Sequence, residues 1–287
     1  MNLRLIKLLP LSGFAIMLLV FAGCKAPMSK EAVPAVAAET DGQILDLLQY
    51  RYAKAVPLKA NGQCMLLYHV EGKPRKENFP IQLWLNPPSE IYMQGDVAFN
   101  AKGIMLGSNA EEFWLALQPK EVSSYWWGEW SRQSSLGTML INPRVVLEAV
   151  GIINVESGRQ WSFGQEDSYR VLINQDGSGI KRIYIGRRDS LVRRIKYIGV
   201  EGETLTVTEL DRFVKAAEDF YVPTAIKIIR RLPNEKKDTV SITIKLVTVK
   251  PVEFTQEQRR FLFERHPAKG FQHIYHIIEG EAVEQPQ

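Results

Sequence analysis

Most of this chain alternates apolar and polar residues with a period of two, and this alternation limits its fold more than any other feature. In residues 239–249, Val240, Ile242, Ile244 and Leu246 share one parity, and none is charged. Successive side chains of a strand point to opposite faces, so such a segment buries one face and leaves the other exposed or half-exposed. Predicted strands span residues 64–70, 81–86, 90–99, 103–109, 111–117, 121–127, 169–175, 180–186, 191–199, 203–213, 225–232 and 239–249. A mainly β (α+β) fold is therefore predicted.

Short turn sequences separate neighbouring strands. Gly-Lys-Pro, Asn-Pro-Pro and Ser-Asn-Ala stand between the early segments and are rich in turn-forming residues. Evenly spaced strands with short turns indicate an antiparallel meander. About twelve strands without an internal repeat could close into a barrel, form a sandwich, or curl as an open half-barrel covered by helices. Periodicity alone does not choose among these three folds.

Three helices are predicted around the strands. The first spans residues 41–54, with Asp41 as its N-cap. The second starts at Asn142 as N-cap with Pro143 in the first helical position, and it ends before Gly151. The third covers residues 255–266.

The N-terminus predicts export and anchoring. Arg4 and Lys7 precede an apolar stretch at residues 8–22, which is shorter than the roughly 20 residues of a membrane span, so residues 1–23 read as a signal peptide. The tetrapeptide ending at Cys24, Phe-Ala-Gly-Cys, resembles the bacterial lipobox. That resemblance implies cleavage before Cys24 and a diacylated or triacylated thiol. An ordinary signal peptide or an uncleaved anchor are the alternatives.

The remaining chain divides into a tether and one domain. Residues 24–40 contain prolines and alanines but no aromatic residue, and they read as a tether to a single domain at residues 41–287. Removing residues 1–23 discards Arg4 and Lys7 and no acid, so the formal net charge falls from +4 to +2. This balance argues against nucleic acid as a partner.

Neither the cysteines nor the histidines indicate a reactive centre. Cys64 is the only cysteine besides Cys24 and lies in a strand-like run, so we expect a buried, unreactive thiol and no disulfide framework. His273 and His276 would point apart on a strand. No phosphate-binding loop or nucleophile elbow is present in the sequence. We therefore predict a protein that is not an enzyme and that takes no cofactor and no metal.

The order of the elements resembles that of the LolA/LolB/LppX-type periplasmic lipoprotein-carrier superfamily. The local similarities are the sequences NPPSEIYMQG, GIMLGSNAEEFWLALQPKEVSSYWWG, NPRVVLEAVG and FYVPTAIKI. The resemblance covers most of residues 42–250, and the extension from about residue 254 lies outside it. It implies a strongly curved antiparallel half-barrel of about 11–12 strands, with a helical lid over an apolar concave face.

The same resemblance implies a cavity that binds acyl chains. Aromatic and methionine side chains make adaptable apolar walls, although such residues on strands are more often ordinary core. Adjacent Trp126 and Trp127 must point to opposite faces, so at least one faces away from such a cavity. The candidate lining residues are Trp84, Tyr92, Met93, Phe99, Met105, Phe113, Trp114, Trp126, Trp127, Val146 and Leu147.

The resulting hypothesis is a membrane-anchored lipoprotein that binds lipid or lipoprotein acyl chains and accepts or inserts lipoproteins at the outer membrane. Lys25 follows Cys24 where, by resemblance to the sorting rule of some bacteria, Asp would favour retention at the inner membrane, so we expect an outer-membrane address facing the periplasm. Basic pairs such as Arg187-Arg188 and Arg193-Arg194 read as a solvated face or as a surface for anionic lipid head groups. The alternative is a structural or scaffolding lipoprotein whose interior is filled by its own side chains.

Overall fold

The computed structural model describes residues 38, 40–70, 73–97, 100–119, 122–132, 141–156, 159–231 and 239–286. The described residues belong to one compact unit, Glu31–Gln287. Cys24 and Phe99 lie outside the described residues.

The first half of the unit is a helix followed by a six-strand meander. The elements are α1 (Asp41–Ala53), β1 (Leu58–Val70), β2 (Lys73–Asn86), β3 (Glu90–Val97), β4 (Asn100–Ser108), β5 (Glu112–Leu117), β6 (Ser124–Glu129) and the 3₁₀ turn η2 (Trp130–Arg132).

The second half begins with a short helix and continues with a second meander. The elements are α2 (Pro143–Ala149), β7 (Trp161–Glu166), β8 (Tyr169–Asp176), β9 (Gly179–Gly186), β10 (Val192–Ile198), β11 (Thr204–Ala217), β12 (Phe220–Arg231), β13 (Thr239–Pro251), α3 (Gln256–Phe263), β14 (His273–Ile278) and β15 (Glu281–Glu284).

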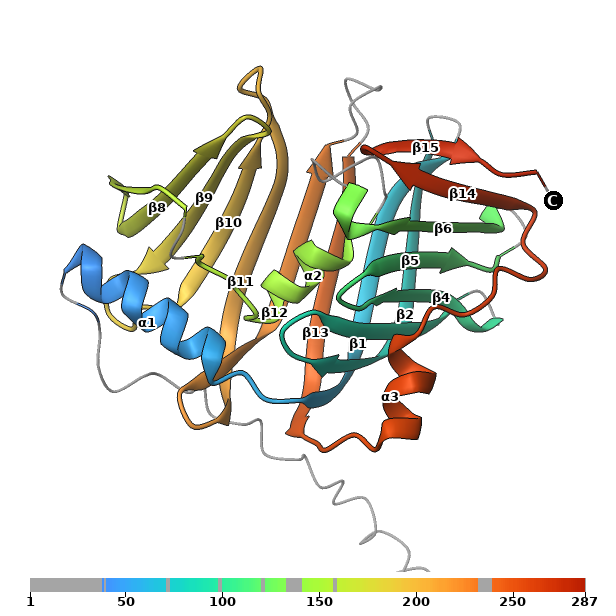
Figure 1. Ribbon diagram of the computed structural model, residues 1–287, viewed down its shortest axis with the longest axis horizontal. Coiled ribbons are helices and arrows are strands. Elements are labelled where there is room, and N and C mark those ends of the chain that lie inside the picture. Colours follow the sequence, from blue (N-terminus) through green and yellow to red (C-terminus); the bar gives the residue numbers. More distant parts are fainter. Residues whose placement is uncertain are drawn as a thin grey trace, which may run out of the picture. The chain divides into compact units, whose positions relative to one another are not determined.

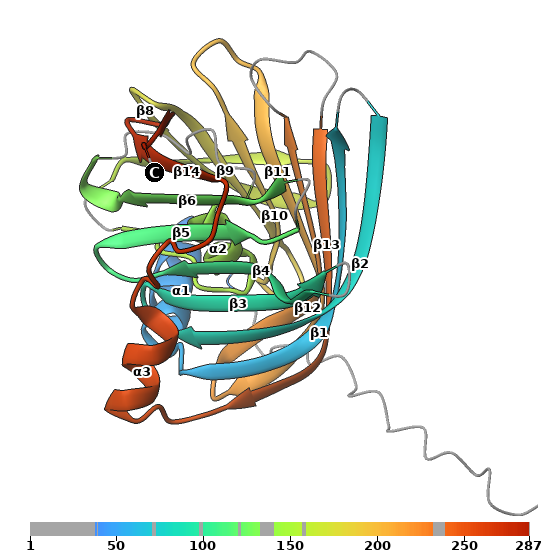
Figure 2. The ribbon, with the colours of Figure 1, turned by 90° about the vertical axis from the view of Figure 1, so that its right-hand side faces the viewer.

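The described strands form one open sheet of 15 strands, in the order β15-β14-β6-β5-β4-β3-β2-β1-β13-β12-β11-β10-β9-β8-β7. Figure 2 shows that this sheet is curved, and the edge strands β7 and β15 do not pair with each other. The structure thus favours the open sheet over a closed barrel. One prediction was wrong: the sheet is mixed, because β14 pairs with β6 in parallel.

The strand count also exceeds the expected 11–12. Three described strands are absent from the predicted ranges: β14, β7 and β15. The β7 sequence WSFGQE offers only two large apolar residues, Trp161 and Phe163, and the four residues of β15 are all exposed. Such edge strands are specified by their pairing partner more than by their own alternation.

The helices follow their capping residues. The second and third begin where predicted: α2 has Asn142 as N-cap and Pro143 at its start, and α3 is capped by a capping box from Thr255. The N-cap of α1 is Thr40, not Asp41 as predicted, because the Thr40 hydroxyl accepts from the backbone of Gln43 in a second capping box. Helix α3 ends at Phe263, before the predicted end at residue 266.

The larger hydrophobic core, here called the inner cluster, joins α1 and α2 to one face of the sheet (Figure 1). It includes Ile44 of α1, Val146 of α2, and strand residues such as Leu83, Ile183 and Ile244, all nearly inaccessible to solvent. Burial of this many apolar side chains is the main favourable contribution to folding. Both sheet halves share this core, which explains how an open sheet holds together.

The opposite face of β2–β6 carries a second core, here called the outer cluster. Its buried members are Tyr92, Trp114, Ala116, Tyr125, Leu262 and Phe263, and partly buried Trp84, Met105, Trp127, Phe254, Ala268, Phe271 and Ile274 pack against them. The strand residues of this cluster are covered by the C-terminal segment, residues 252–286 (Figures 1 and 2). The extension beyond the family resemblance is therefore an integral part of the domain.

Candidate functional site

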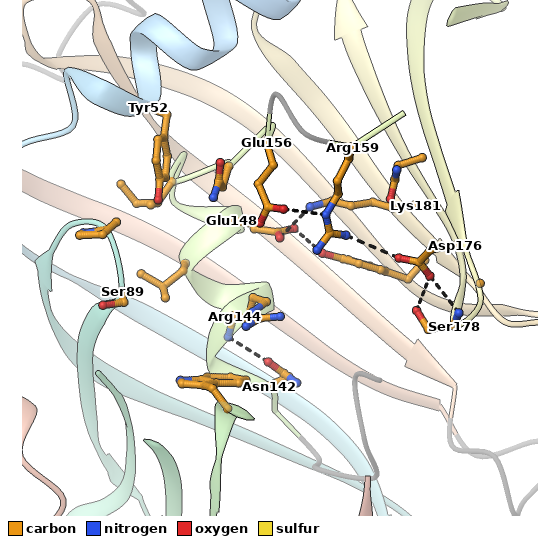
Figure 3. Close-up of a pocket in the computed structure, with 18 of the residues that line it drawn as sticks. Tyr52, Ser89, Asn142, Arg144, Glu148, Glu156, Arg159, Asp176, Ser178 and Lys181 are labelled. Atoms are coloured by element: carbon orange, nitrogen blue, oxygen red, sulfur yellow. Dashed lines mark hydrogen bonds and ion pairs between the residues drawn. The ribbon is translucent and has the colours of Figure 1, made fainter. Parts of the chain in front are cut away.

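A cavity of about 490 Å³ lies beside α2 (Figure 3). Its walls are contributed by α1, the turn before β3, the end of β4, η2, α2 and the strands β7–β11. Its size is within the range of small-molecule binding sites, roughly 300–1,000 Å³. Strands from both halves of the sheet meet here through α2, which packs against β4 and β11.

The sequence of α2 divides the helix between core and cavity. Val145, Val146 and Val150 are buried in the inner cluster. Arg144 and Glu148, which are four residues apart and so share one helix face, line the cavity together with Leu147. The helix therefore presents one basic, one acidic and one apolar side chain to the same space.

Glu148 connects α2 to the second meander through an ion pair and a hydrogen bond. Its carboxylate accepts a hydrogen bond from Lys181 Nζ of β9 at 2.7 Å and another from the hydroxyl of Tyr197 in β10. Burial and the neighbouring carboxylate hold the pKa of Tyr197 well above its usual value, so this phenol remains a donor. Breaking one partner of such a buried pair leaves the other charge poorly compensated.

A second charged group stands at the wall formed by β8. Arg159 pairs with Glu156 at 2.8 Å and with Asp176 at 3.5 Å. The Asp176 carboxylate also accepts from the Ser178 hydroxyl at 2.6 Å and backbone N–H at 2.9 Å, and these bonds lower the pKa of Asp176. Figure 3 shows Arg159, Asp176 and Ser178 joined in this way.

Arg144 has a different environment. Its guanidinium lies over the Trp130 ring, 4.7 Å from the centroid, and it forms no ion pair with any residue that the structure describes. The Trp130 indole in turn donates to the Asn109 carbonyl at 3.0 Å, which fixes the ring. Among the described residues, the site therefore combines paired charges on one wall with an arginine that has no ion-pair partner.

The candidate lining residues fall on both sides of the sheet. Met93, Phe113, Val146 and Leu147 belong to the inner cluster, and Trp126 packs against it. The other described candidates belong to the outer cluster or pack against it: Trp84, Tyr92, Met105, Trp114 and Trp127. The prediction that Trp126 and Trp127 face opposite sides is confirmed. Of the candidates that the structure describes, Leu147 alone lines this cavity.

Sequence reasoning missed the charged residues of the cavity. One signal was available, because Arg144 and Glu148 interrupt an otherwise apolar helix at an i, i+4 spacing. Lys181 and Tyr197 gave no such signal, since they become neighbours only through the pairing of β9 with β10. The role of the C-terminal segment was likewise invisible to a resemblance that ended near residue 250.

The cysteine and histidine predictions can be compared with their surroundings. Cys64 is buried, as predicted, and its burial raises the pKa of the thiol to about 12. His273 and His276 lie on strand β14; His273 Nδ1 is 2.7 Å from Glu284 Oε1, and His276 stacks on Trp127. Among the described residues, no group of three His, Cys, Asp or Glu side chains is placed to hold a metal ion. No helix in the described part of the chain has the length and apolarity needed to span a bilayer.

Comparisons with known proteins give structural similarity only. No protein-family model matches the chain, and no curated protein matches it. A putative outer membrane lipoprotein-sorting protein domain from Vibrio parahaemolyticus is 10% identical, with a TM-score of 0.49 over 75% of this chain and 94% of that one. A LolA superfamily protein from Nitrosomonas europaea is 12% identical, with a TM-score of 0.46 over 77% and 97%. A DUF1329 family protein from Desulfovibrio piger is also 12% identical, with a TM-score of 0.46 over 78% and 98%.

Proposed function

We propose that this protein binds lipid or lipoprotein acyl chains in the cavity beside α2, without catalysing a reaction. The observation that carries the proposal is the apolar wall of that cavity. Leu147 and Ile152 are buried members of the inner cluster, and the half-buried Ile180, Ile198 and Leu205 also line the cavity. Each methylene of an acyl chain buried there would contribute about 0.8 kcal/mol.

The position of α2 supports a role for this helix as the lid. It is only seven residues long, and its apolar side chains cover the inner face of the sheet. A bound chain that displaced α2 would exchange helix side chains for its own methylenes on the same face. In this proposal Met93, Phe113 and Trp126 belong to the acyl-binding wall, whereas the outer-cluster candidates act as core.

The proposal includes lipid anchoring through Cys24, after removal of residues 1–23 as a signal peptide. Residues 24–40 then serve as the tether of the folded unit, and the protein faces the periplasm from the outer membrane, where it accepts or inserts lipoproteins. The support is the lipobox-like sequence before Cys24 and Lys25 after it. Two or more acyl chains give stable attachment, whereas one chain is marginal.

A scaffolding role is the second candidate, and one observation favours it. The side chains of Val145, Val146 and Val150 already fill the inner face under α2. If α2 never leaves this position, only the cavity beside it remains for a ligand. Direct identification of bound lipid separates the two functions.

The test is mass spectrometry of lipids that co-purify with the full chain carrying Cys24→Ser. Ile198→Trp fills the cavity wall, and Val200→Trp is the matched control because Val200 is 75% exposed. We expect acyl ligands with the parent and the Val200→Trp variant, and strongly reduced recovery with Ile198→Trp. Recovery of no acyl ligand, together with no transfer from an acylated lipoprotein donor, would contradict the proposal and favour scaffolding.

A further inference from the structure

The charges of the cavity beside α2 are unevenly compensated. Its lining includes three basic side chains, Arg144, Arg159 and Lys181, and three acidic side chains, Glu148, Glu156 and Asp176. A formal count gives no net charge. The hydrogen bonds and ion pairs, however, show which of these charges are available to a ligand.

All three carboxylates are engaged by protein donors. Glu148 accepts from Lys181 and Tyr197. Glu156 and Asp176 share Arg159, and Asp176 also accepts from Ser178. Their negative charges are thus offset locally, and the same pairs occupy Lys181 and Arg159. An anion entering the cavity would meet little uncompensated negative charge on these walls.

Arg144 is the basic group left over. Its side chain is exposed toward the cavity, and among the described residues its guanidinium contacts the Trp130 ring without an ion pair. Stacking on an aromatic ring orients a guanidinium while its planar N–H donors stay available at the edge. These donors match the oxygens of a phosphate or carboxylate.

The apolar wall begins next to this arginine. Leu147 lies three residues after Arg144 on α2, and both line the cavity, as do Ile152 and Ile198. Figure 3 shows Arg144 apart from the paired charges of Arg159 and Asp176. An anchoring cation and an apolar wall thus lie within one space.

We propose that the cavity selects an anionic amphiphile, with its phosphate or carboxylate on Arg144 and its acyl chain along Leu147, Ile152 and Ile198. This inference rests on the acyl-binding function proposed above and adds the chemical class of the head group. The chain supplies the apolar contact, and Arg144 supplies the discrimination against uncharged lipids.

The test compares a fluorescent palmitate, its uncharged methyl ester and inorganic phosphate on the full chain carrying Cys24→Ser. The variant is Arg144→Gln, which removes the charge without leaving a carboxylate unpaired. Arg188→Gln is the matched control, because Arg188 is exposed in the turn between β9 and β10 and does not line the cavity. Thermal unfolding verifies that both variants are folded.

We expect Arg144→Gln to weaken palmitate binding about tenfold, the loss of one charge-assisted hydrogen bond. The same variant should leave the methyl ester unaffected, and Arg188→Gln should change neither. If Arg144→Gln weakened the binding of palmitate and of the methyl ester equally, or left palmitate binding unchanged, the assignment of the head group to Arg144 would be overturned. The proposal of acyl binding would still stand. Binding of neither probe to the parent would contradict the proposed function itself. Binding of inorganic phosphate with a higher affinity than palmitate would identify free phosphate as the ligand. That result would overturn the proposal of an anionic amphiphile.

Discussion

The inner and outer clusters lie on opposite faces of the same strands and are closed in different ways. The outer cluster is covered by the C-terminal segment, where Tyr125 donates to the His266 carbonyl at 2.7 Å and Arg265 pairs with Glu112 at 2.6 Å. The inner cluster is covered in part by α2, whose free side borders a cavity of about 490 Å³. The outer cluster is thus covered by the chain's own C-terminal segment, whereas α2 leaves the cavity beside it on the inner side.

This difference separates the candidate residues into two groups. Tyr92 and Trp114 are as buried as Met93 and Phe113, yet strand alternation places them under α3 and the segment that follows it. Trp127 contacts His276, which stacks on it at 4.0 Å, and Arg265, 4.2 Å above its ring. We therefore propose that these outer residues serve stability and that the inner face serves binding.

The largest expected effect comes from emptying the outer cluster. Trp114→Ala removes a fully buried indole and should lower the free energy of unfolding by about 3–5 kcal/mol, measured by urea denaturation. Trp114→Phe should cost less, since the Trp114 indole nitrogen has no hydrogen-bond partner among the described residues. Acyl binding by the folded fraction should be unchanged in both. If acyl binding fell by more than the folded fraction, the result would contradict the assignment of the outer cluster to stability alone.

An intermediate effect is expected where α2 is fastened over the inner face. Glu148→Gln leaves Lys181 without its carboxylate and should lower stability by about 1–3 kcal/mol. Hydrogen exchange should accelerate in α2 and remain slow in β5 and β6. The double variant Glu148→Gln, Lys181→Met should recover part of the loss, because it removes both members of the buried pair. If hydrogen exchange accelerated equally in the inner and outer clusters, the result would argue against a local role of Glu148 in holding α2.

The smallest effect concerns Asp176 at the cavity wall. Hydrogen bonds from Ser178 lower the pKa of Asp176 in the folded state. The corresponding stability is present above the carboxyl's unfolded pKa and is lost as the pH falls through the lowered folded value. Because Asp176 is solvent-exposed, screening limits the contribution to about 0.5 kcal/mol or less.

Ser178→Ala should therefore reduce stability slightly near pH 7 and should shift the acid limb of the stability curve, with no difference from the parent at the lowest pH. NMR titration of the Asp176 carboxyl, with Ser162→Ala as a serine control on β7, checks this sign. A titration midpoint that stays lowered in Ser178→Ala would assign the pKa shift to the backbone N–H of residue 178, which this variant keeps, and to Arg159.

Several features of the fold follow from local sequence alone. Alternation located most strands, and Asn142-Pro143 fixed the start of α2. Local signals could not place β7 and β15, whose short polar sequences become strands only beside β8 and β14. Nor could they show that β14 joins β6 in parallel, because no local pattern encodes a pairing between residues about 150 apart.

The same limit applies to the site. Alternation predicted that Trp126 and Trp127 face opposite ways, but it could not say which face the C-terminal segment covers. The partnership of Glu148 with Lys181 and Tyr197 spans 33 and 49 residues and depends on α2 docking against the sheet. Apolar residues in the sequence predict that a core exists. The position of a cavity beside that core depends on how distant segments pack together, which local sequence does not show.

The most direct measurement of the central claim is a methyl NMR titration of the full chain carrying Cys24→Ser with palmitate. Ile152, Ile180 and Ile198 report on the cavity beside α2, and Leu262 and Ala116 report on the outer cluster. We predict saturable shifts of the three isoleucine methyl groups and unchanged Leu262 and Ala116 signals. Shifts confined to Leu262 and Ala116, or no shift at all at saturating palmitate, would contradict acyl binding on the inner face.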